Sequence, residues 1–100
     1  MPILTIAYAN PADTEKFDRH YTEVHRPLAE KLPGLKELRV RRCTSLDETP
    51  APYYVLVELS FESTGALYQA LSSPEGQAAA VDAATFAESG FTLFVQHEWT

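Results

Sequence analysis

Hydrophobic residues recur with two different periods along the chain, and the change from one period to the other predicts four strands and two helical regions. Apolar or β-branched residues alternate with others over residues 2–8, 35–43, 53–61 and 91–99, which is the period of a strand. Over residues 13–32 they repeat every three or four positions, as on one face of an amphipathic helix. Residues 63–72 and 74–84 show helical spacing too, with Ser73 and Pro74 placed to begin the second of these helices.

This order of elements, β-α-β-β-α-β, predicts an α+β ferredoxin-like domain with a four-stranded antiparallel sheet and helices on one face. The 100 residues form a single domain, residues 1–100. Apolar residues also occupy the sheet face that the helices leave open, so we expect a second copy to cover it in a homodimer. Glu58 lies on that open face, where we expect an interface salt bridge with Arg39 or Arg41.

The long helix over residues 13–32 contains a proline, Pro27, inside its apolar stripe. Proline has no N–H to donate to the carbonyl of Glu23, and it disfavours helical geometry at Arg26. The helix is therefore predicted to kink or restart near residues 25–27. This irregularity frees a backbone carbonyl and changes the direction of nearby side chains, among them His25.

Charge and composition exclude several classes of function. The chain has 14 acidic and 8 basic residues and a net charge of −6, which disfavours binding to nucleic acid or to an anionic membrane. No apolar stretch approaches the roughly 20 residues of a membrane span, and the first residues are typical of a strand rather than a signal peptide. One cysteine, Cys43, fits the reducing cytoplasm. Zinc-ligand spacings and glycine-rich dinucleotide fingerprints are missing, so no metal or cofactor is expected.

His25 is the leading candidate for acid–base chemistry, because an imidazole passes protons near neutral pH. Its alternative role is to bond a carbonyl that the broken helix leaves free. Tyr21 lies one helical turn earlier, where it would orient a substrate oxygen or belong to the core. Tyr8, Phe17 and Leu28 are expected to line a cleft between the sheet and the helices, with Tyr8 at the end of the first strand.

Four further residues have weaker signals. His97 and Trp99 share a face of the last predicted strand, and they are expected either to line the same cleft or to lie in the dimer interface. His20 is expected on an exposed flank of the first helix. Asp82 is considered as a carboxylate partner that would fix the tautomer of His25, although no local pattern brings the two together.

Several motifs together resemble the EthD family, named from bacterial degradation of ethyl tert-butyl ether. The motifs are Phe17-x-x-x-Tyr21-x-x-x-His25-x-Pro27-Leu28, Leu32-Pro33-Gly34-Leu35, Pro52-Tyr53-Tyr54, Leu71-x-Ser73-Pro74-Glu75-Gly76-Gln77 and Phe86-Ala87. They extend over nearly the whole chain. The resemblance implies a dimeric α/β barrel in which two ferredoxin-like protomers pack sheet against sheet, and a role in small-molecule catabolism.

Three functions are compatible with this resemblance. The first is a cofactor-independent isomerase, cyclase or oxidoreductase acting on a small hydrophobic or aromatic metabolite. The second is a metabolite-binding or accessory module for a partner oxygenase, which predicts ligand affinity without turnover. The third is a haem-binding barrel with His25 or His97 as the axial ligand.

Overall fold

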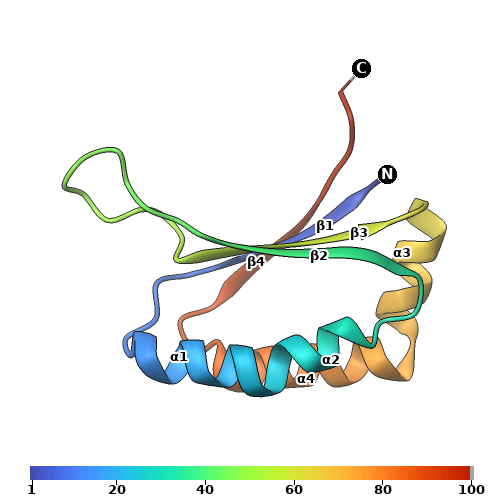
Figure 1. Cartoon of the computed structure of the whole chain (residues 1–100), viewed down its shortest axis with the longest axis horizontal. Coiled ribbons are helices and arrows are strands. Elements are labelled where there is room, and N and C mark those ends of the chain that lie inside the picture. The colour runs from blue at the N-terminus through green and yellow to red at the C-terminus, as the bar shows by residue number, and fades with distance from the viewer. Residues whose placement is uncertain (100) are drawn as a thin grey trace.

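The computed structural model describes residues 1–99 and contains a four-stranded antiparallel sheet with the helices gathered on one of its faces (Figure 1). The strands lie in the order β2-β3-β1-β4. The elements are β1 (Ile3–Tyr8), α1 (Thr14–His20), a π-helical turn η1 (Tyr21–His25), α2 (Arg26–Glu30), β2 (Leu35–Arg42), β3 (Val55–Phe61), α3 (Thr64–Ser72), α4 (Pro74–Phe86) and β4 (Phe91–Gln96). The α+β ferredoxin-like prediction is confirmed.

Alternation along the strands divides the side chains between the two faces of the sheet. Leu4 of β1 lies opposite Leu59 of β3 and Val95 of β4, and this row faces the helices and forms the core. Thr5, the next residue of β1, lies opposite Glu58 on the open face. There the Gln96 amide donates to the Thr5 hydroxyl at 2.7 Å and to the Glu58 carboxylate at 2.8 Å. Within one chain Glu58 is thus bonded to Gln96, while Arg39 pairs with Glu37.

All four strands are shorter than the alternation suggested, and the last strand differs most. The prediction that the last strand continues to residue 99 is wrong, because Gln96 already lies opposite Ile3, the first residue of β1. Beyond Gln96 there is no neighbouring strand to continue the pairing. His97 and Trp99 therefore lie in an exposed C-terminal segment, on the side of the sheet away from the helices (Figure 1).

The junction between α3 and α4 is a tight corner that fixes the direction of α4. Ser73 ends α3 and caps α4, its side chain accepting a hydrogen bond from the Gly76 N–H at 3.0 Å. A Cβ atom built on Gly76 would lie 2.2 Å from the Ala70 carbonyl oxygen, so only glycine allows this approach. The corner thereby sets how α4 lies against the helices that precede β2.

Candidate functional site

A π-helical turn within the first long helix brings His20 and His25 to the same side. These residues are five positions apart, and in a regular α-helix they would be rotated by about 140° from one another. In η1 the Arg26 N–H donates to the Tyr21 carbonyl, the i→i+5 bond of a π-helix, which widens the turn and brings residues five apart closer to the same side. Pro27 follows at once. The predicted irregularity is therefore present, and it takes the form of a widened turn rather than a break.

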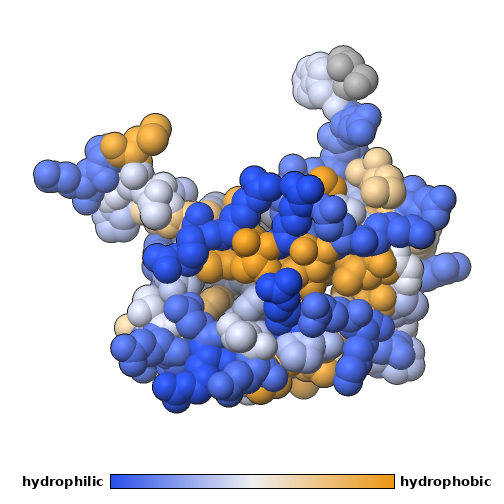
Figure 2. Space-filling view, in the orientation of Figure 1, coloured by the Kyte–Doolittle hydropathy of each residue, from blue (hydrophilic) through white to orange (hydrophobic). Residues whose placement is uncertain are grey.

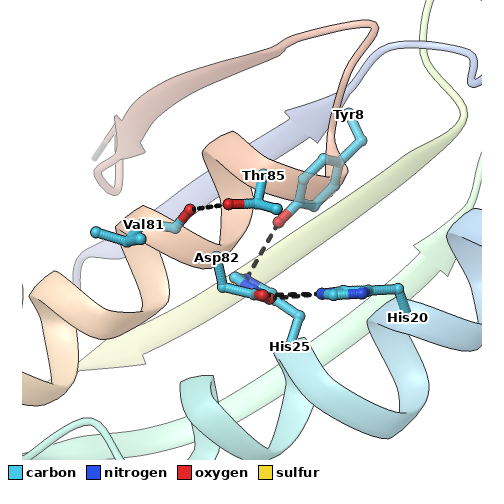
Figure 3. A network of polar contacts seen from close by, with 6 residues as sticks. All are labelled: Tyr8, His20, His25, Val81, Asp82 and Thr85. Carbon is cyan, nitrogen blue, oxygen red and sulfur yellow. Dashed lines mark hydrogen bonds and ion pairs between the residues drawn. The ribbon is translucent and has the colours of Figure 1, made fainter.

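Asp82 of α4 joins the two imidazoles (Figure 3). Nε2 of His20 lies 2.8 Å from Oδ1 and 3.0 Å from Oδ2 of Asp82. Nδ1 of His25 lies 2.9 Å from Oδ2. One carboxylate thus accepts hydrogen bonds from two histidines of another helical segment.

The carboxylate determines which nitrogen of each ring carries the proton. An ionised carboxylate only accepts hydrogen bonds, so His20 must present Nε2–H and His25 must present Nδ1–H. In the neutral state the remaining nitrogens, Nδ1 of His20 and Nε2 of His25, therefore carry lone pairs. The two rings have opposite tautomers, and each has one unprotonated nitrogen that can accept a hydrogen bond or a proton.

The environments of the two histidines differ. The His25 side chain is 9% exposed, whereas that of His20 is 30% exposed. Burial lowers the pKa of His25 below its ordinary value, and the hydrogen bond and charge of Asp82 act in the opposite direction. Phe86 stacks on the His20 ring, with centroids 4.8 Å apart and planes inclined by 17°, and thereby fixes the orientation of that ring.

Two tyrosines complete the surroundings of His25. The Tyr8 hydroxyl lies 3.4 Å from Nε2 of His25, a long hydrogen bond that the hydroxyl donates. Burial raises the pKa of Tyr8, so this phenol keeps its proton at neutral pH. The ring of Tyr21 lies 5.7 Å from that of His25, and its buried hydroxyl has no hydrogen-bond partner among residues 1–99. Burial raises the pKa of Tyr21 to about 12.

These groups do not form a metal centre. Within the described residues, 1–99, no group of three or more His, Cys, Asp or Glu side chains is arranged to hold a metal ion. The geometry explains this for the histidine pair, since both imidazoles direct N–H groups, not lone pairs, toward Asp82. The arrangement is instead suited to holding and moving protons.

The residues predicted from the sequence occupy three different places. Tyr8 and Tyr21 adjoin His25, as described above, and Phe17 is buried beside Tyr8 with ring centroids 5.3 Å apart. Leu28 is half-buried and lines a separate hollow of about 230 Å³ against the start of α4. His97 and Trp99 are exposed in the C-terminal segment and do not approach this group within one chain.

His20 and Phe86 are the site residues that the sequence reasoning missed. His20 was expected on an exposed flank beside Arg19, whereas its side chain is 30% exposed and bonded to Asp82. The informative signal was the combination of two histidines five residues apart with a proline two residues later. Proline interrupts the regular bonding of a helix, and in this structure the interruption is a π-helical turn that brings the pair to one side.

The fold and the site together define an α+β ferredoxin-like protein with a histidine–carboxylate group between the helices. The family profile of the EthD domain matches residues 9–90, and the chain belongs to the EthD family. An uncharacterized 11.0 kDa protein of Rhodococcus erythropolis, described as lying in the thcB-thcC intergenic region, is 44% identical over 97 residues. That alignment covers 97% of this chain and 94% of the relative.

Solved structures agree with this assignment. An EthD family protein from Bacillus halodurans is 34% identical, with a TM-score of 0.92 and 98% of each chain covered. A protein from Jannaschia sp. described as dimeric and ferredoxin-like has a TM-score of 0.71 at 16% identity, covering 97% of this chain and 98% of its own. This second likeness shows the fold alone. Among residues 1–99, none of the helices has the length and apolarity to cross a membrane.

Proposed function

We propose that this protein binds a small hydrophobic or aromatic metabolite and moves a proton on it with the histidine pair joined by Asp82. The observation that carries the proposal is the position of Asp82, within 3.0 Å of a ring nitrogen of both His20 and His25. A buried carboxylate that orients an imidazole and stabilises its cation is the usual support of a histidine acid–base group. Here one carboxylate supports two such groups.

The proposed reaction is an isomerisation or cyclisation that begins with proton abstraction next to a carbonyl group. An unprotonated ring nitrogen takes the proton from carbon, which leaves an enolate and an imidazolium. The imidazolium then returns that proton to a different atom of the same substrate, so no oxidant, reductant or external cofactor is consumed. The low pKa of His25 keeps its ring unprotonated near neutral pH, and the Asp82 charge stabilises the cation once it forms.

Exchange of hydrogen for deuterium tests the proposal before the physiological substrate is known. The protein is incubated in D₂O with a panel of cyclic enones, lactones and aryl ketones, and deuterium incorporation at carbon is followed by mass spectrometry. We expect catalysed incorporation into at least one class, and a loss of roughly 10²–10⁴-fold in Asp82→Asn. Glu23→Gln, which alters an exposed carboxylate of η1, is the matched control and keeps the wild-type rate. Incorporation that is equal in wild type and Asp82→Asn would contradict the proposal.

We also propose that the protein is a homodimer that buries the open face of its sheet. That face has apolar side chains, including Phe94, which is 45% exposed in the single chain. The loop after β2 and the C-terminal segment extend beyond the body of the molecule, and the loop exposes Leu46 among hydrophilic residues (Figures 1 and 2). Exposed apolar area of this kind marks a protein–protein contact. The dimeric relative from Jannaschia sp. offers a precedent for such an assembly.

Sedimentation velocity tests the homodimer directly. We expect wild type to sediment as a species of twice the chain mass of 11.1 kDa. The mass of the Phe94→Glu species should shift toward that of a single chain. Val81→Glu is the matched control, because Val81 is equally apolar and 69% exposed but lies on α4, away from the open face. A monomeric wild type, or an unaffected Phe94→Glu, would refute the proposed interface.

A further inference from the structure

One hollow of the described molecule lies beside His20 and is not lined by His25. It has a volume of about 390 Å³, is partly open, and is lined by the loop after β1, by one side of α1, by the end of α4 and by the turn at 87–90. We call it the end cavity. Small-molecule sites have volumes of roughly 300–1,000 Å³, so the end cavity suits a compact ligand with one or two rings. His20 is part of its lining, and His25 and Asp82 are not.

We propose that the end cavity is the ligand site and that it takes a phenol or an enol whose hydroxyl group donates a hydrogen bond to Nδ1 of His20. This inference rests on the proposed function, because it also takes a ring nitrogen of the histidine pair as the proton acceptor. It goes further by assigning that role to His20, by giving the site a location and by naming the chemical class of the ligand. His25 then acts as a positioning residue that shares Asp82.

The tautomer of His20 determines the kind of group that it recognises. Since Nε2–H is bonded to both oxygens of Asp82, the neutral ring has its lone pair on Nδ1. No side chain or backbone group of residues 1–99 bonds to that nitrogen, whereas Nε2 of His25 already receives the Tyr8 hydroxyl. A ligand that completes the hydrogen bonding of His20 must therefore be a donor.

The remaining lining supports a neutral aromatic or enolic molecule. Phe86 is half-buried and Phe17 is buried beside it, with ring centroids 5.2 Å apart, and a ligand ring would lie against this apolar part of the lining. Asp13 and Glu88 also line the cavity and disfavour a ligand that arrives as an anion. Lys16 is the one fixed cation of the lining, and it would stabilise the oxygen once the hydroxyl proton moves to His20.

The proton path implied by this arrangement is short. The ligand hydroxyl transfers its proton to Nδ1 of His20, which gives a phenolate or enolate and an imidazolium. The positive ring is held by Asp82 through Nε2–H, and the protonated Nδ1 later returns the proton to carbon or oxygen of the ligand. Phe86, parallel to the ring at 4.8 Å, keeps His20 from rotating during this exchange.

The test uses three probes on the full chain labelled with ¹⁵N: 4-cyanophenol, its methyl ether 4-methoxybenzonitrile, and benzoate. We expect 4-cyanophenol to shift the amide signals of Ala87 and Gly90 and the Nδ1 signal of His20. The ether lacks the donor and should bind about tenfold more weakly, the value of one net hydrogen bond to a well-placed acceptor. Benzoate, an anion without a donor, should also bind more weakly than the phenol.

Variants separate this inference from the proposed function. His20→Gln can still donate to Asp82, and it should lose the preference for phenol over ether, while the control Glu23→Gln retains it. The inference would be overturned if wild type bound the phenol and the ether equally, or if the His25 ring responded in place of His20. Both measurements use the wild-type protein, so neither depends on the folding of a variant. If the phenol binds as predicted but no compound exchanges deuterium, the proposed proton transfer fails and the ligand site stands. If deuterium exchange depends on Asp82 but not on His20, the proposed proton transfer stands and the ligand site at His20 fails.

Discussion

Replacing Asp82 by Asn tests whether the negative charge between the two imidazoles matters, because Asp and Asn have nearly the same shape and differ in charge. The amide oxygen of Asn accepts from one imidazole, but the amide N–H₂ would face the N–H of the other. One charge-assisted hydrogen bond, worth about 1.5–3 kcal/mol, is then lost, and the second becomes a weaker neutral bond. Water replaces part of the loss at His20, whose side chain is 30% exposed.

These contributions give a loss of about 2–3 kcal/mol in the free energy of unfolding of Asp82→Asn. For a domain of this size, each kcal/mol shifts Tm by roughly 4–8 °C, so we expect a fall of about 10–20 °C in a thermal melt followed by circular dichroism. Glu23→Gln is the matched control, since it removes an exposed carboxylate from the same π-helical turn and should shift Tm by no more than about 4 °C. An Asp82→Asn protein whose Tm equals that of Glu23→Gln would refute the reasoning.

Three other changes test separate parts of the account. The folded state holds the pKa of His25 below its ordinary value of 6.5, so the folded protein binds fewer protons than the unfolded chain. The free energy of unfolding should therefore fall as the pH drops below about 6.5, and more steeply in Asp82→Asn. A free energy of unfolding that does not change with pH in urea denaturation would contradict this. Tyr21→Phe removes a buried hydroxyl without a partner among residues 1–99 and should leave stability unchanged or raise it by about 1 kcal/mol in urea denaturation; a clear loss would argue against this. Gly76→Ala places a Cβ 2.2 Å from the Ala70 carbonyl oxygen and should lower the free energy of unfolding by about 3 kcal/mol or more. A variant with the thermal stability of wild type would contradict this.

The positions of the strands and helices along the chain were predictable from sequence because they depend on local periodicity. Alternation identified the four strands, and Ser73 before Pro74 correctly marked the start of α4. The end of β4 was not predictable in this way. It depends on where β1 begins, since Gln96 faces Ile3, and a pairing limit of that kind is a property of two distant segments.

The candidate site was only half visible in the sequence for a related reason. Pro27 indicated an irregular helix beside His25, but the pattern did not tell a kink from a π-helical turn. That distinction decides whether His20 faces outward or joins His25. Asp82 is 57 residues from His25, and only the packing of α4 beside the π-helical turn brings the carboxylate to both rings.

The tautomers of His20 and His25 test the central claim most directly. Long-range ¹H–¹⁵N correlation spectra of histidine-labelled protein, recorded above the ordinary histidine pKa, identify which ring nitrogen carries hydrogen. If one carboxylate joins the pair, His20 is protonated at Nε2 and His25 at Nδ1, and both signals change in Asp82→Asn. The same tautomer in both rings, unchanged by that substitution, would contradict the bridge and the proton chemistry inferred from it.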